Sequence, residues 1–424
     1  MKRLSGRFTV RRLIAVAVAG ALPAVGLGVV GASAADRGAD APPATKVPMT
    51  PCALKYASGS LYVGASNDVF KVSRATGTAI TVAPGFPFAG QAFAQACGVA
   101  VDGAGNVLVA DGGAVVAVAA KTGTFYGLKM TAGRVYPLVA DLQPSTAVDV
   151  QLDPAGNVVI ATGGSEASST DNETDSQVRV LAQRTGTFYG QKMTKGRLYV
   201  IAGVLNGQGI WPPCEDSASR AAAQAGTKAT GTDLGYQIGT LRFDADGNII
   251  LADVGGDTEG PCGGSEGPVH SRVDVIPARA GTFYGQKMTV GDIYPIAGLG
   301  TKTGNGVPAI DSNLQAAAVA LDHDGNILVA TGETGHPNAA VVVIAAKTGA
   351  FYGQKMIKGD IYSVVRSFPG DNSVSSVAVD NAGNVLAGEQ YQVEMLAEKT
   401  GDYYGVKARA GHLYTIAGTG SYPV

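Results

Sequence analysis

Residues 101–110 read Val-Asp-Gly-Ala-Gly-Asn-Val-Leu-Val-Ala, and this stretch decides the fold. A short apolar strand ends at Asp102. The Gly105-Asn106 pair then tolerates the positive φ angles that a tight turn needs before a second strand returns. The pattern recurs at 152–161, 243–252, 321–330 and 379–388. Repetition of one hairpin along the chain predicts a repeat architecture.

A second repeated segment follows each of these hairpins. Residues 121–136 contain Lys-Thr-Gly-Thr-Phe-Tyr-Gly and end at a tyrosine, and related copies stand at 184–199, 280–294, 347–362 and 399–414. A β-branched strand precedes the segment and another strand closes the unit, so we expect the Phe-Tyr-Gly part to be a longer loop. Four short antiparallel strands per unit are typical of a propeller blade. A degenerate first copy at 53–83 brings the predicted number of blades to six.

The pattern at 101–111 resembles the core of the NHL repeat. That resemblance implies an all-β fold, a six-bladed β-propeller of four-stranded antiparallel blades that is often extracellular in bacteria. The sequence departs from the family in one respect, because Gly112-Gly113-Ala114 stands where the Asn-His-Arg segment that names the repeat is expected. The Phe-Tyr-Gly segments resemble those of exported actinobacterial proteins, which implies a location but no activity.

The N-terminus has the features of an export signal. Five basic residues precede the apolar stretch 13–30, and Ala32-Ser33-Ala34 supplies the small residues that a signal peptidase cuts after. We therefore expect a signal peptide at 1–34, a Pro/Ala-rich linker at 35–51 and the propeller at 52–424. The protein should be secreted, extracellular or associated with the cell wall, without a membrane anchor after cleavage. A retained anchor is the competing interpretation of the apolar stretch.

Net charge and cysteine content indicate which partners to exclude and how many disulfides to expect. The net charge of −2 argues against nucleic acid and against an anionic membrane surface. The four cysteines of an exported chain predict two disulfides. Cys52 and Cys97 begin equivalent strands of adjacent blades, and Cys214 and Cys262 lie in two long insertions, so we expect the pairs Cys52–Cys97 and Cys214–Cys262.

The extra length of the repeats gathers on one face of the predicted ring. Turns between first and second strands, and between third and fourth strands, keep a constant length and share one face. The insertions fall between second and third strands or between blades, at 163–177, 204–236, 254–270, 299–313 and 333–338. Irregular loops gathered on one face often mark a binding surface.

Three carboxylates are candidates for a metal site. The residue that ends the second strand is Asp111 in blade two, Asp253 in blade four and Glu389 in blade six. If these side chains converge at the mouth of the central channel, their oxygens suit Ca²⁺ or another hard cation. The alternative is that they accept hydrogen bonds from the protein's own turns, as aspartates commonly do.

The irregular face also carries candidate ligand-binding residues. Trp211, the only tryptophan, stands in a Pro-rich loop, where it could stack on a sugar ring or anchor a protein partner. The alternative is that it packs over the ring as a plug. Glu333 and His336, with His270, are a conceivable second site, and solvated loop side chains are the competing interpretation. For the Phe-Tyr-Gly aromatics we weigh a recognition surface against packing between blades, which repeat aromatics more commonly do.

These observations predict a secreted, monomeric, non-catalytic propeller that binds a protein or carbohydrate partner through its irregular face. The alternative function is a metal-dependent lactonase or lyase at the channel mouth, by analogy of fold only. The two functions require different channels. An enzyme needs a deep, open, charged mouth, whereas a binding module can fill its channel.

Overall fold

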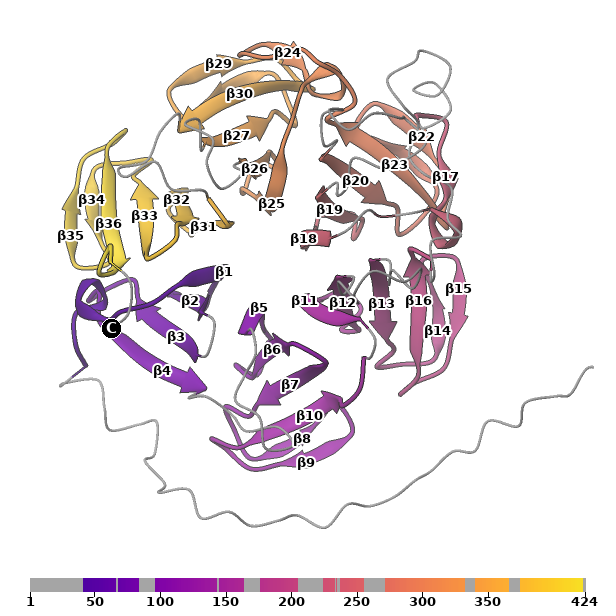
Figure 1. Ribbon diagram of the computed structural model, residues 1–424, viewed down its shortest axis with the longest axis horizontal. Helices are drawn as coiled ribbons and strands as arrows, with labels where there is room; N and C mark the ends of the chain where they lie inside the picture. Colours follow the sequence, from indigo (N-terminus) through magenta and orange to yellow (C-terminus); the bar gives the residue numbers. More distant parts are fainter. Residues whose placement is uncertain are drawn as a thin grey trace, which may run out of the picture. The chain divides into compact units, whose positions relative to one another are not determined.

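The computed structural model describes residues 41–65, 68–83, 96–142, 145–163, 176–204, 224–232, 234, 237–254, 271–331, 340–365 and 374–421. These residues form six antiparallel sheets around a common centre (Figure 1). The predicted all-β class and the six four-stranded blades are therefore confirmed. No helix among the described residues is long and apolar enough to span a membrane.

The blades follow one another along the chain. Blade 1 contains β1 (Pro51–Ala57), β2 (Ser60–Ala65), β3 (Asp68–Ser73) and β4 (Ala79–Ala83). Blade 2 contains β5 (Ala96–Val101), β6 (Val107–Asp111), β7 (Ala114–Val118) and β10 (Val135–Val139). Blade 3 contains β11 (Thr146–Leu152), β12 (Val158–Gly163), β13 (Gln177–Leu181) and β16 (Leu198–Ala202).

Two of the later blades carry a short fifth strand. Blade 4 contains β18 (Gln237–Phe243), β19 (Ile249–Val254), β20 (Arg272–Ile276), β23 (Asp292–Ala297) and the added β17 (Thr227–Lys228). Blade 5 contains β25 (Ala316–Leu321), β26 (Ile327–Thr331), β27 (Ala340–Ile344), β30 (Asp360–Val365) and the added β24 (Val307–Pro308). Blade 6 contains β31 (Ser376–Val379), β32 (Val385–Gly388), β33 (Gln392–Leu396) and β36 (Leu413–Gly418).

The innermost strands form a closed ring, in which each contacts the innermost strand of the next blade and β31 contacts β1. The hydrophobic core is divided among the junctions, with one cluster of buried residues between each pair of neighbouring blades. Successive residues of a strand point to opposite faces of its sheet. The second strands, which are buried on both faces, therefore supply both neighbouring clusters.

The Phe-Tyr-Gly segments form β-hairpins rather than the expected longer loops. They are β8 (Gly123–Phe125) with β9 (Leu128–Met130), β14 (Gly186–Phe188) with β15 (Gln191–Met193), β21 (Gly281–Phe283) with β22 (Gln286–Met288), β28 (Gly349–Phe351) with β29 (Gln354–Met356), and β34 (Gly401–Tyr403) with β35 (Val406–Ala408). Tyr126 and Gly127 form the turn of the first hairpin, with φ of 54° and 82°. Two consecutive positive φ angles are typical of the tightest hairpin turns.

Hydrogen bonds lock each hairpin to the turn between the first two strands of its blade. In blade 2, the Tyr126 hydroxyl donates to Asp102 Oδ2 at 2.8 Å, and Asn106 Nδ2 donates to the same oxygen at 2.7 Å. Equivalent bonds join Tyr189 to Asp153, Tyr284 to Asp244, Tyr352 to Asp322 and Tyr404 to Asp380. A hydrogen bond to a charged group contributes about 1.5–3 kcal/mol, which offsets the cost of a positive φ at tyrosine. The two repeated motifs therefore recur together because they bond to each other.

Three connections share a short 3-10 helix that joins neighbouring blades. These helices are η1 (Ala44–Lys46), η2 (Ala229–Gly231) and η3 (Ala309–Asp311). Each begins with a buried alanine, and a buried Met49, Leu234 or Leu314 follows five positions later. The η1 helix contacts β36 of blade 6, and its Ala44 N–H donates to Gly77 O of blade 1. Part of the predicted linker 35–51 therefore belongs to the propeller.

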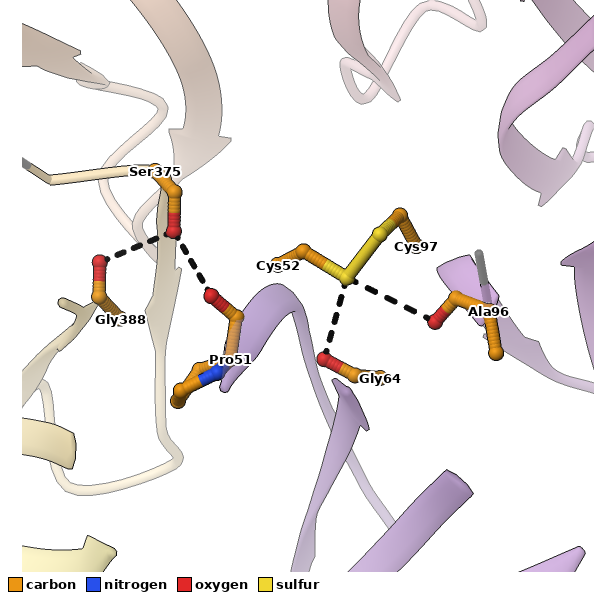
Figure 2. The surroundings of a disulfide bond; sticks show 7 residues. All are labelled: Pro51, Cys52, Gly64, Ala96, Cys97, Ser375 and Gly388. Carbon is orange, nitrogen blue, oxygen red and sulfur yellow. Dashed lines mark hydrogen bonds between the residues drawn. A yellow bond between two sulfur atoms is a disulfide. The ribbon is translucent and has the colours of Figure 1, made fainter. Parts of the chain in front are cut away.

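The ring closes without exchange of a strand between its ends, because blades 1 and 6 each consist of strands consecutive in the chain. Ser375 Oγ donates to Pro51 O at 2.9 Å across this junction (Figure 2). The predicted disulfide between Cys52 and Cys97 is confirmed, with Cα atoms 5.0 Å apart, and it joins blades 1 and 2. Cys214 and Cys262 lie outside the described residues, so their predicted pairing stays a prediction.

Candidate functional site

The three carboxylates proposed as metal ligands are buried, but the structure does not gather them into a metal site. Asp111 is 8% exposed, Asp253 2% and Glu389 0%. Within the described part of the chain, no group of three histidine, cysteine, aspartate or glutamate residues is placed to hold a metal ion.

The environment of Asp253 favours the alternative in which the carboxylates bond to the protein itself. Asp253 lies opposite Arg272 on the neighbouring strand, and the Arg272 guanidinium donates a short hydrogen bond to Asp253 Oδ2. Arg272 Nε also donates to Asp274 Oδ2 at 2.7 Å. The guanidinium therefore occupies Asp253 Oδ2 and would repel a cation that approached this oxygen. Glu389 accepts a bond from Gln392 Nε2 at 3.2 Å.

A polar network that sequence reasoning missed joins the innermost strands of opposite blades. Asp149 on β11 accepts bonds from Arg242 Nη1 at 2.8 Å and from the Leu241 backbone N–H at 2.9 Å, both on β18. The other nitrogen of the same guanidinium, Arg242 Nη2, donates to Leu54 O on β1 at 3.3 Å. Lys55 Nζ donates to Gln151 Oε1 at 2.9 Å. Figure 1 shows β1 and β18 on opposite sides of the ring, so the network crosses its centre.

Hydrogen bonding saturates the carboxylate at the centre of this network. Besides Arg242 and Leu241, Asp149 accepts bonds from the Val150 backbone N–H at 2.8 Å and from Gln151 Nε2 at 3.2 Å. A buried carboxylate that accepts four hydrogen bonds has little capacity left for a ligand. We call Lys55, Asp149, Gln151 and Arg242 the channel network, and its geometry is that of a structural tie between blades.

Burial perturbs the titration of the channel network. Removal from water raises the pKa of Asp149, and this effect outweighs the opposite influence of Arg242. Burial, followed by repulsion from Arg242, lowers the pKa of Lys55 to about 8. The Lys55 side chain keeps partial access to solvent. The only carboxylate of the network, Asp149, is buried and is not exposed to act as a base. The lysine of the network has a lowered pKa and donates to the amide oxygen of Gln151.

The remaining predicted ligand residues cannot be placed. Trp211, Glu333 and His336 lie outside the described residues, as does His270. The tyrosines of the fourth strands are described, and they act within their blades. Tyr136 accepts a hydrogen bond from the Thr131 backbone N–H at 2.8 Å, and equivalent bonds involve Tyr199, Tyr294, Tyr362 and Tyr414. These tyrosines therefore hold the turn that precedes the fourth strand of their own blade.

Solved structures that resemble this chain do so at low sequence identity. The chain is similar to a gluconolactonase from Xanthomonas campestris, with 13% identity, 81% of this chain and 83% of that chain covered, and a TM-score of 0.44. It is also similar to the calcium-binding protein regucalcin from Agrobacterium tumefaciens, with 12% identity, 86% and 95% covered, and a TM-score of 0.47. A streptogramin B lyase gives 11% identity, 82% and 93% covered, and a TM-score of 0.42.

Because identity is low and each TM-score lies below 0.5, these similarities carry no argument about function. No family model matches the sequence, and no curated protein is a detectable relative. The function must therefore be argued from the residues of this chain.

Proposed function

We propose that this protein is a secreted, non-catalytic β-propeller of the NHL-like type that binds a protein or glycan partner outside the cell. The observation that carries the proposal is the channel network. In this network Arg242 of blade 4 donates both to Asp149 of blade 3 and to Leu54 O of blade 1. Enzymatic use of the channel would require an open, charged mouth with groups free to contact substrate. Here Arg242 and Asp149 bind each other, and Lys55 is bonded to the amide oxygen of Gln151.

Two further observations support the proposal. Of the three carboxylates that a metal-dependent lactonase or lyase would use, Asp253 is paired with Arg272, which disfavours a cation at that residue. The disulfide between Cys52 and Cys97 suits an oxidising compartment, which agrees with the export signal predicted at 1–34. Trp211, Glu333 and His336 remain the predicted contact residues of the irregular face.

A turnover assay tests the absence of catalysis. The exported protein would be incubated with a panel of aldonolactones, with Ca²⁺, Mn²⁺ or Zn²⁺ and then with EDTA, while acid release is followed. We expect no hydrolysis above the buffer rate under any condition. Hydrolysis would overturn the proposal if EDTA abolished it and if the double variant Asp111→Asn with Asp253→Asn abolished it too. The control variant Asp324→Asn, at an exposed site, should then keep the activity.

A further inference from the structure

The outer edges of blades 2 and 3 differ in charge from those of blades 4 and 5. We call the segments 121–134, 184–197, 279–292, 347–360 and 399–412, which contain the outer hairpins of blades 2 to 6, the rim segments. Those of blades 2 and 3 contain seven basic residues and no acidic residue: Lys121, Lys129, Arg134, Arg184, Lys192, Lys195 and Arg197. All seven are exposed. In blades 4 and 5, by contrast, the rim segments include Asp292 and Asp360.

A second difference concerns ion pairing, and it depends on one position of the turn between the first two strands. In blades 4 and 5, the turn between the first two strands contains Asp246 or Asp324, which pairs with the first basic residue of the rim segment. Arg279 lies 2.6 Å from Asp246, and Lys347 lies 2.7 Å from Asp324. Blades 2 and 3 have Ala104 and Ala155 at this position. None of the seven basic residues forms an ion pair with a described residue.

The same substitution changes the surroundings of the rim aromatics. The Arg279 guanidinium lies 5.2 Å from the centre of the Phe283 ring, and Lys347 Nζ lies 5.9 Å from that of Phe351. No described cation covers Phe125 or Phe188, the equivalent residues of blades 2 and 3. Arg184 donates instead to Ala155 O at 2.9 Å. Without the aspartate, the basic residue is not held over the ring. Phe125 and Phe188 keep partial access to solvent, as does Phe351 of blade 5.

A cleft of about 560 Å³ lies between blades 2 and 3 beside these residues. Asp102, Phe125 and Tyr126 of blade 2 line one side, and Asp153, Pro154 and Gln183 of blade 3 line the other. Both carboxylates accept hydrogen bonds from tyrosine hydroxyls, Asp102 from Tyr126 and Asp153 from Tyr189. Leu128 is 36% exposed on the hairpin of blade 2, where blades 3, 4 and 5 have a glutamine that bonds to the fourth strand. This edge therefore carries aromatic rings, an amide, two tyrosine-bonded carboxylates and cations that form no ion pair with a described residue.

From these observations we infer that the edge of blades 2 and 3 binds a linear acidic polysaccharide outside the cell. Its pyranose rings would stack on Phe125 and in the adjacent cleft, and its carboxylates would bind Lys129, Lys192 and Arg197. A polymer with a charge on each sugar suits cations distributed over two neighbouring blades. This inference rests on the proposed binding function and names its partner class, but it assigns the contact to the rim of blades 2 and 3 and not to the irregular face. A surface that attracts any polyanion needs cations alone, whereas this one also has aromatic rings on which a sugar can stack.

Isothermal titration of the exported protein with sodium polygalacturonate tests the inference, with neutral dextran as the control polymer. The main variant is Ala104→Asp with Ala155→Asp, which gives blades 2 and 3 the ion pairs of blades 4 and 5. We expect it to weaken polygalacturonate binding about tenfold or more. Lys129→Gln with Lys192→Gln should have a similar effect. The matched control, Lys287→Gln with Lys355→Gln, removes as many charges from blades 4 and 5 and should change affinity less than about twofold.

The stacking contribution is measured separately. Phe125→Leu with Phe188→Leu should weaken polygalacturonate binding several-fold, while circular dichroism confirms that the variant is folded. Equal binding of polyphosphate or single-stranded RNA, with no effect of the phenylalanine substitutions, would show a general polyanion surface and overturn the inference. Absence of polygalacturonate binding, or equal losses in both lysine variants, would also overturn it. Neither result bears on catalysis, so metal-dependent turnover remains the separate sign that the proposed function fails.

Discussion

Replacing Arg242 with methionine should destabilise the propeller strongly, because it leaves the Asp149 carboxylate buried without a cation. The two side chains are 11% and 2% exposed, and Arg242 Nη1 lies 2.8 Å from Asp149 Oδ2. Breaking a buried ion pair costs about 3–5 kcal/mol. Asp149 retains three N–H donors in the variant, from Val150, Gln151 and Leu241, so we expect a loss of about 3 kcal/mol, at the lower end of that range.

A double-mutant cycle isolates the interaction. Asp149→Asn should cost about 2–3 kcal/mol, and the double variant should lose at least about 2 kcal/mol less than the sum of the single losses. Urea unfolding at pH 7, followed by circular dichroism, measures each free energy of unfolding, and equal m-values would confirm that the variants unfold alike. Lys347→Met, which breaks an ion pair with 58% and 50% exposed side chains, should cost less than about 0.5 kcal/mol. Additive single losses, within about 0.5 kcal/mol, would refute the role assigned to the channel network.

Three further predictions follow from the described contacts. Tyr284→Phe removes the 2.8 Å hydrogen bond to Asp244 and should lower the free energy of unfolding by about 1.5–3 kcal/mol in urea titration. Replacing both Cys52 and Cys97 with alanine, at a sequence separation of 45, should destabilise by about 2–4 kcal/mol, and an unchanged urea midpoint would contradict this. The pKa of Lys55 is lowered to about 8 in the fold, so between pH 8 and 10 the unfolded chain binds the extra proton. Stability should therefore rise by about 1–2 kcal/mol across that window, after allowance for partial solvent access, and Lys55→Met should lose this rise.

The strand pattern and the first disulfide could be predicted from sequence because they follow local rules. The turn residues at 102–106 and the alternating strands around them specify a hairpin, and repetition specifies a ring. When the strands of the repeats are aligned, Cys52 and Cys97 stand at equivalent positions of neighbouring blades. Because the innermost strands of neighbouring blades lie side by side, this alignment predicts that the two cysteines are close enough to bond.

The channel network could not be predicted because it depends on contacts across the ring. Lys55, Asp149, Gln151 and Arg242 stand in strands that are otherwise largely apolar, which is a visible anomaly in the sequence. Their partners, however, lie on blades that are far apart along the chain. Sequence spacing shows which strand carries each residue, but not which opposite strand it reaches.

The metal hypothesis placed Asp253 near the channel mouth from its position at the end of β19. The structure shows that the cross-strand neighbour decides its role, since Arg272 lies directly opposite. The Phe-Tyr-Gly segments form hairpins and not the predicted loops. Their turns place a tyrosine at a positive φ, which is uncommon, and the bond to Asp102 that stabilises this conformation comes from another turn. Similarly, the composition of 35–51 is typical of a linker, but Ala44 and Met49 pack into the core between blades 6 and 1.

Lysine footprinting tests most directly where this protein binds. The exported protein would be acetylated briefly with and without saturating polygalacturonate, digested, and analysed by mass spectrometry for the modification of each lysine. The account predicts protection of Lys129, Lys192 and Lys195 on blades 2 and 3, and unchanged modification of Lys287 and Lys355 on blades 4 and 5. Protection of Lys287 and Lys355 equal to that of the blade 2 and 3 lysines, or no protection at any site, would contradict it.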